Sequence, residues 1–186
     1  MRIDLHTHSR ASDGTQTPTQ LVRAAAEAGL DVMALTDHDT TNGWAEAEGA
    51  ALEVGLALVC GMEISTRHDR HGVHLLAYLP DPSYPPLAEE LERILGGRRS
   101  RLPAMLERLR EVGVDIDADG VRRVAGDTAA TGRPHVADAL VALGVVRDRG
   151  EAFARYLNPG RPAHAQRYAA PLESMIRIVG EAGGGT

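Results

Sequence analysis

The chain has 186 residues, and it is 43% hydrophobic, 25% charged and 3% aromatic, which is the composition of an ordinary globular protein. Its net charge of −6 and isoelectric point near 5.7 exclude a general nucleic-acid coat and a binder of membrane surfaces, but they allow a small phosphorylated substrate. Cys60 is the single cysteine, so no intrachain disulfide forms. Because no apolar segment is long enough to act as a leader or a membrane span, we expect a cytoplasmic protein.

Strands and helices alternate over the first 80 residues. The pattern predicts strands at about 2–8, 31–36, 57–64 and 73–79, with helices at about 17–29 and 43–54 between them. Thr17 is the expected N-cap of the first helix, Pro18 takes the first helical position, and Gln20 closes a capping box. This alternation favours an α/β fold with a mainly parallel sheet or barrel.

The remainder of the chain has a different character. A loop at 81–86 precedes helical patterns at about 86–95, 99–112, 119–125, 134–143 and 149–157. A last helix, at about 172–179, returns to the sheet. We therefore predict three segments, which are the first part of the sheet or barrel (1–80), a mostly helical insertion or lid (81–170), and a return helix (171–186).

Residues of metal-ligand type follow the predicted strands. His6 and His8 are two positions apart and therefore share one face of the first strand. The second strand ends in Asp37-His38-Asp39, and the third ends in Glu63. Because the carboxyl ends of parallel strands meet at one rim, and chemistry gathers there, we expect these side chains to converge.

Taken singly, each of these residues has an ordinary explanation. Asp13 lies in a Ser-Asp-Gly turn, residues 37–39 are suited to cap a helix, and His74 alternates with apolar neighbours. Their convergence on one rim favours a metal site, and imidazole with carboxylate suits Zn, Mn or Fe better than Ca or Mg. We interpret His68 and His71 as residues of a hairpin tip instead.

Two arginine groups indicate an anionic substrate. Residues 96–101, Gly-Gly-Arg-Arg-Ser-Arg, are predicted to form a basic turn that opens a helix, although a solvated charged turn explains them equally well. In the second group, Arg133 and His135 stand at the start of another predicted helix. They either reach a ligand or anchor the insertion.

Together these motifs resemble those of the PHP (polymerase and histidinol phosphatase) superfamily. The resemblance lies in Asp4–Ser9, Ser12–Gly14, Thr36–Asp39, Gly61–Glu63 and Val73-His74. Within the insertion, Gly97-Arg98, Gly132–His135 and Arg155–Gly160 resemble the branch that acts on nucleoside 3',5'-bisphosphates, 5'-AMP or short RNA 5' ends.

The resemblance implies a distorted (β/α)7 barrel of the TIM type, with a helical insertion and up to three divalent metals, Mn, Zn or Fe. It places His6, His8 and Glu63 on the first metal, Glu63 and His74 on the second, and Asp13 and His38 on the third. It makes Asp37 a support for a ligand. The expected substrate contacts are Asp39, Arg98, Arg99, Arg101, Arg133 and His135.

The resemblance also implies elements that this sequence lacks. The superfamily pattern continues with a His-Pro ligand and a Gly-Ser-Asp-x-His element, neither of which occurs here. We therefore expect an incomplete barrel in which each metal lacks one ligand.

The implied reaction is hydrolysis of a nucleotide phosphomonoester by a hydroxide that bridges two metals, with Glu63 and His38 as catalytic residues. The expected partner is a small phosphorylated nucleotide or a short RNA, without a membrane and without general duplex binding. Two alternatives stay open, namely hydrolysis of histidinol phosphate and a non-catalytic metal-binding remnant. The long basic insertion argues against the first of these, whereas the missing ligands favour the second.

Overall fold

The computed structural model describes residues 1–126, 128 and 130–186. The chain forms two compact units, of which the first comprises residues 1–95 and 169–186 and the second comprises residues 96–168. Helix α3 (Pro85–Glu111) begins in the first unit, where Leu87 and Ile94 are fully buried. The predicted division into segments 1–80, 81–170 and 171–186 stays a prediction.

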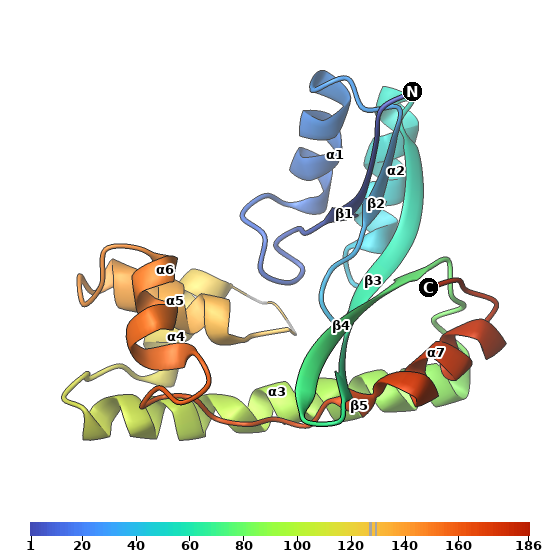
Figure 1. The fold of residues 1–186 in the computed structure, drawn as a ribbon. Helices are drawn as coiled ribbons and strands as arrows, with labels where there is room; N and C mark the ends of the chain where they lie inside the picture. Colours follow the sequence, from blue (N-terminus) through green and yellow to red (C-terminus); the bar gives the residue numbers. More distant parts are fainter. Residues whose placement is uncertain (127, 129) are drawn as a thin grey trace. The chain divides into compact units, whose positions relative to one another are not determined.

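The first unit is built on a sheet with the strand order β1-β2-β3-β4 (Figure 1). Strand β1 (Ile3–Thr7) pairs in parallel with β2 (Val32–Leu35), which in turn pairs in parallel with β3 (Ala57–His68). Strand β4 (His71–Tyr78) runs antiparallel to β3, and the short β5 (Ala170–Pro171) adds a parallel pair to β3. The predicted α/β architecture with parallel strands is confirmed.

The hairpin of β3 and β4 is the antiparallel part of this sheet. His68 pairs with His71 at its end, and Asp69 turns the chain with a φ of 52°. The interpretation of both histidines as hairpin-tip residues is confirmed.

Two helices pack against the parallel strands, α1 (Pro18–Glu27) and α2 (Trp44–Val54). The Thr17 hydroxyl accepts from the Gln20 amide at 3.2 Å, and the Gln20 side chain accepts from the Thr17 amide at 3.0 Å, so the predicted capping box is present. The apolar core between these helices and β2 includes Val22, Ala25, Met33, Leu35, Ala47, Ala50, Ala51 and Leu56.

The second unit is helical. It contains the later turns of α3, followed by α4 (Ala118–Ala125), α5 (Arg133–Ala142), α6 (Arg149–Ala152) and a π-helical turn, η1 (Phe153–Leu157). Its own core includes Met105, Leu109, Ile116, Val121, Val136, Leu140 and Leu157. Helix α7 (Leu172–Glu181) then belongs to the first unit.

One prediction for this region is wrong. Residues 96–101 do not form a turn that opens a helix, because α3 continues unbroken through Gly96, Gly97 and Pro103. A β-carbon at Gly97 would lie 3.0 Å from Tyr168 Cβ and 3.1 Å from the Tyr168 amide nitrogen, so this glycine permits close packing instead of breaking the helix. Tertiary packing therefore outweighs the low helix propensity of glycine, which costs about 1 kcal/mol per residue.

Strand β1 lies at the edge of the sheet, and residues 3–6 are exposed while Thr7 is half-buried. Closure of the sheet into a (β/α)7 barrel stays a prediction. None of the described helices has the length and apolar character needed to cross a bilayer.

Candidate metal centre

The predicted placement of the candidate ligands at strand ends is only partly correct, because β3 continues past Glu63 to His68 by pairing with β4, and His74 lies within β4. His6 lies on β1, and His8 follows one residue after the strand ends. Beyond β2 the chain continues alongside β3, where His38 forms an isolated parallel bridge with Glu63. The Asp39 amide donates to the Glu63 carbonyl and the Glu63 amide donates to the Asp37 carbonyl, each at 3.2 Å. This short extension of the parallel pairing places His38 next to Glu63.

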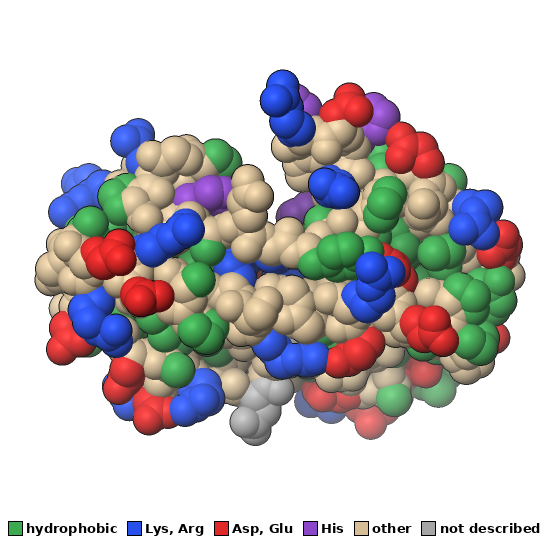
Figure 2. Space-filling model, turned by 90° about the horizontal axis from the view of Figure 1, so that it is seen from below, with side chains coloured by type: hydrophobic (Ala, Val, Ile, Leu, Met, Phe, Trp, Pro, Cys, Tyr) green, Lys and Arg blue, Asp and Glu red, His purple; other side chains and the backbone are tan. Residues whose placement is uncertain are grey.

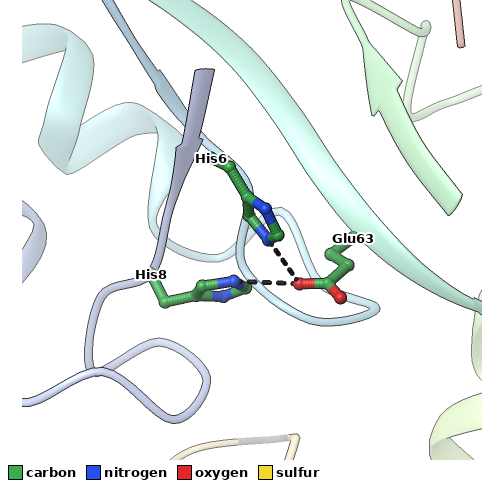
Figure 3. A group of neighbouring side chains, drawn as sticks. All are labelled: His6, His8 and Glu63. Atoms are coloured by element: carbon green, nitrogen blue, oxygen red, sulfur yellow. Dashed lines mark hydrogen bonds and ion pairs between the residues drawn. The ribbon is translucent and has the colours of Figure 1, made fainter. Parts of the chain in front are cut away.

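Glu63 is the centre of the cluster. Its Oε2 lies 2.8 Å from His6 Nε2 and 2.9 Å from His8 Nε2, and both rings point toward it (Figure 3). His74 Nδ1 forms a hydrogen bond with the other carboxylate oxygen, Oε1. In the β3–β4 register Glu63 faces Leu76, so His74 is its diagonal neighbour on the same face of the sheet. Side chains from β1, from the loop after β1 and from β4 therefore meet at the carboxylate of Glu63 on β3.

A second carboxylate joins the cluster through the loop after β1. Asp13 Oδ1 lies 3.8 Å from His8 Nδ1, and Asp13 Oδ2 lies 3.5 Å from His38 Nε2. The ring centroids of His8 and His38 are 4.7 Å apart. The loop turns sharply at Gly14, where a β-carbon would lie 2.2 Å from the His8 carbonyl oxygen. Glycine is thus required for Asp13 to approach the histidines.

Six residues form three overlapping groups, and within each group the potential ligand atoms all lie within 4.8 Å of one another. These groups are His6–His8–Glu63, His8–Asp13–His38 and His38–Glu63–His74. The structure therefore brings together all six predicted metal ligands. His8, His38 and Glu63 each belong to two of these groups.

The electrostatics match a site for cations. Burial raises the pKa of Glu63, but hydrogen bonds to His74 and His8, together with the nearby His38, outweigh burial and hold this pKa far below its usual range. Burial lowers the pKa of His8, whereas its bond to Glu63 and the charge of Asp13 reverse that effect and raise it.

The residues present fit divalent metals. Imidazole nitrogen with carboxylate oxygen is the donor set of Zn, Mn and Fe sites. His38 Nδ1 is buried and has no hydrogen-bond partner among the described residues. A buried ring nitrogen without a partner is costly, and a metal would satisfy it.

Asp37 supports the loop that carries Asp13. This carboxylate is fully buried and accepts the Ser9 amide at 2.8 Å and the hydroxyls of Ser9 and Ser12 at 2.6 Å each. The Ser12 hydroxyl also lies 3.5 Å from His8 Nδ1. Burial raises the pKa of Asp37, and the serine bonds partly offset that rise. These contacts agree with the predicted supporting role, which itself stays a prediction.

Asp39 is hydrogen-bonded to Ser65 of β3. It is buried, its φ of 55° lies in the left-handed region, and its carboxylate accepts the Ser65 amide and, at 2.7 Å, the Ser65 hydroxyl. These bonds tie the end of β2 to β3. Contact of Asp39 with a substrate stays a prediction.

The arginine groups lie in the second unit. Arg98 and Arg101 are buried, Arg99 is exposed, and Arg133 and His135 stand at the start of α5. His135 Nδ1 accepts the Gly132 amide at 3.1 Å, so this side chain caps the helix.

The sequence analysis did not identify Ser9 and Ser12 as partners of Asp37, or Ser65 as the partner of Asp39. The sequence does contain a signal for such contacts. Serine near a strand end commonly bonds aspartate or backbone in adjacent loops. The sequence alone does not show which residue on a neighbouring strand is the partner.

A model of the PHP domain family matches residues 4–123, which include all six candidate ligands. This chain belongs to the PHP domain family. It is 39% identical over 189 residues to the 3',5'-nucleoside bisphosphate phosphatase of Chromobacterium violaceum, covering 98% of this chain and 64% of that protein. It is also 39% identical over 183 residues to a 5'-3' exoribonuclease of Haemophilus influenzae, covering 98% of this chain and 66% of that protein.

Two solved structures superpose closely on this PHP chain. An amidohydrolase from Chromobacterium violaceum, which contains sulfate and no metal, has a TM-score of 0.94 at 39% identity, covering 99% of this chain and 65% of that one. A candidate metal-dependent phosphoesterase from Bifidobacterium adolescentis has a TM-score of 0.94 at 37% identity, covering 98% of this chain and 65% of that one. The chain spans 64–66% of the length of these four proteins.

Proposed function

We propose that this PHP chain carries the metal-binding part of a phosphoesterase that hydrolyses a phosphomonoester of a nucleotide. The observation that carries the proposal is the set of three overlapping groups of potential ligands, two of which contain Glu63. Such adjacent groups suit a multinuclear site, which is the arrangement that phosphoryl-transfer enzymes use to hold an attacking and a leaving oxygen.

His6, His8 and Glu63 would hold one metal, and His38 and His74 with Glu63 would hold another. A third would lie among His8, Asp13 and His38. Bound metals would supply a water of lowered pKa and would offset negative charge on the phosphoryl oxygens.

The chain's own side chains have separate roles in this proposal. Glu63 keeps four histidines in one place by contacts to both of its carboxylate oxygens. His38 is half-buried beside Asp13, and a ring nitrogen of His38 that is not bound to metal is suited to hold or release a proton near a leaving oxygen. Asp37, through Ser9 and Ser12, keeps the Asp13 loop in place.

The substrate class follows from the relatives and from the arginines. The relatives at 39% identity are named for nucleoside bisphosphates and for RNA, and the insertion offers Arg98, Arg99, Arg101, Arg133 and His135 as phosphate contacts. Figure 2 shows basic and acidic side chains interspersed over one face of the molecule. That pattern favours a small nucleotide or a short RNA over a long duplex.

The deciding experiment is elemental mass spectrometry on the chain purified without added metal, followed by phosphate-release assays. We expect two or three equivalents of manganese, iron or zinc, and faster release from adenosine 3',5'-bisphosphate than from histidinol phosphate. Faster release from histidinol phosphate would support the other PHP reaction. Bound metal without turnover of either compound would support a non-catalytic domain, and absence of bound metal would contradict the proposal.

A further inference from the structure

Arg133 occupies an unusual setting in the second unit. It is half-buried, its guanidinium carbon lies 5.4 Å from the centroid of the Phe153 ring, and its Nη1 donates a long hydrogen bond of 3.5 Å to the Leu157 carbonyl. It has no ion-pair partner within the described part of the chain. A guanidinium held by an aromatic face and a carbonyl keeps most of its donors available for an anion.

Both of these contacts come from the π-helical turn η1. Phe153 is its first residue and Leu157 its last, and the Asn158 amide closes the wide turn by donating to the Phe153 carbonyl at 3.0 Å. Leu157 is fully buried, and Phe153 packs against the core of the unit. Isolated π turns are rare and often mark functional sites. Here the Phe153 ring and the Leu157 carbonyl of this turn, which we call the aromatic platform, contact the Arg133 guanidinium.

A second arginine increases the positive charge at this place. Arg98 is buried and its Nη1 lies against Gly132, where a β-carbon would come within 2.9 Å of it. Burial, and then the charge of Arg98, lower the pKa of Arg133. A phosphate group beside Arg133 would offset this repulsion, since guanidinium and phosphate form strong charge-assisted hydrogen bonds.

We propose that Phe153 is a positioning residue, which, with the π turn, holds the Arg133 guanidinium in the orientation that receives a phosphate group of the substrate. This inference rests on the proposed function, in which Arg133 contacts the substrate. Without the aromatic face, the long Arg133 side chain would sample more rotamers, and binding an anion would then cost the entropy of ordering it.

The first test measures the affinity of the metal-free chain for inorganic phosphate by calorimetry. We expect Phe153→Leu to weaken binding about three- to tenfold, the size of one cation–π contact, and Phe153→Tyr to restore it because the ring is kept. Leu102→Ala removes apolar contact from the same core and is the matched control, with unchanged affinity. Circular dichroism verifies that each variant is folded.

The second test uses the fact that Phe153 is the only phenylalanine in the chain. Incorporation of 4-fluorophenylalanine therefore places one fluorine label on the platform. We expect phosphate to shift this single ¹⁹F resonance in the wild-type chain and to leave it unchanged in Arg133→Gln. Where turnover is measurable, Phe153→Leu should raise KM and leave kcat unchanged.

The outcomes separate this inference from the proposed function. Equal phosphate affinity in Phe153→Leu and wild type would overturn the role of Phe153, and full affinity in Arg133→Gln would overturn the anion site itself. Phosphate binding that depends on both residues, in a chain that hydrolyses no nucleotide, would uphold the site and contradict only the proposed reaction.

Discussion

At the scale of single residues, Glu63 has the largest effect on the candidate site. Its two oxygens contact four histidines, and the surrounding imidazoles hold its pKa far below the usual range. A neutral isostere at this position keeps the shape of the side chain but loses the negative charge that attracts a cation.

We therefore expect Glu63→Gln to weaken metal binding by at least about a hundredfold, since even residues that only support ligands change affinity by about 10–100-fold. Equilibrium dialysis with elemental analysis measures this loss. Glu48→Gln makes the same charge change on the exposed face of α2 and should bind metal normally. Equal metal affinity in both variants would contradict the central role of Glu63.

Cys60 gives a second prediction at this scale. Burial, followed by its contact with Glu48, raises the pKa of the Cys60 thiol to about 12, against about 8.5 for a free cysteine. The thiolate is the reactive form of cysteine, and only a small fraction of Cys60 is thiolate at pH 8. This effect is partly offset, because a thiolate whose thiol has a higher pKa is a better nucleophile. We expect alkylation at pH 8 roughly 50–100-fold slower than that of glutathione.

The same Glu48→Gln variant tests the cause, because removing the carboxylate should lower the pKa of Cys60 and accelerate the reaction. Mass spectrometry of the alkylated chain over time gives both rates. A folded wild-type chain that reacts as fast as glutathione would contradict the assignment.

At the scale of elements, loops and caps decide how the ligands are presented. Asp13 reaches His8 and His38 only because the loop turns back at Gly14 against the His8 carbonyl. The obstacle to any larger residue there is backbone, which cannot rotate away.

Gly14→Ala should therefore destabilise the chain by about 1–3 kcal/mol or more and reduce the number of bound metals, because the Asp13 group is distorted. Gly49→Ala is the matched control, since Gly49 is an exposed residue of α2 with open space at its β-carbon. That change should stabilise the chain by about 0.5–1 kcal/mol. Urea unfolding measures both effects, and equal stability of the two variants would refute the steric argument.

At the scale of the whole molecule, all six candidate ligands belong to the first unit, and they lie on β1, in the loops after β1 and β2, and on β3 and β4. A ligand that binds the folded state stabilises that state by mass action. Bound metal should thus stabilise the folded first unit by linking the strands and loops that carry the candidate ligands.

We expect about 2.7 kcal/mol of added stability at a free metal concentration of 100 times the dissociation constant. Hydrogen exchange followed by mass spectrometry should show slower exchange in peptides of 3–16 and 57–78, and unchanged exchange in 114–126 and 133–157 of the second unit. EDTA should reverse the effect. Uniform protection of both units would show that metal acts on more than the ligand strands.

The sequence by itself determined the alternation of strands and helices in the first 80 residues, the capping box at Thr17 and the choice of the six candidate ligands. These features depend on local periodicity, on neighbouring side chains, or on the rule that parallel strands end at one rim. Each of them is visible within a few residues of the chain.

Only the tertiary structure decided the features that depend on packing between distant segments. The Gly96-Gly97 pair predicts a helix break, but α3 continues through both residues, and Gly97 packs close to Tyr168. The burial of Asp39 against Ser65, the clamp of Ser9 and Ser12 on Asp37, and the aromatic platform under Arg133 all join residues at least 20 positions apart. Such contacts leave no periodic pattern, because their free energy arises only when the folded chain brings the partners together.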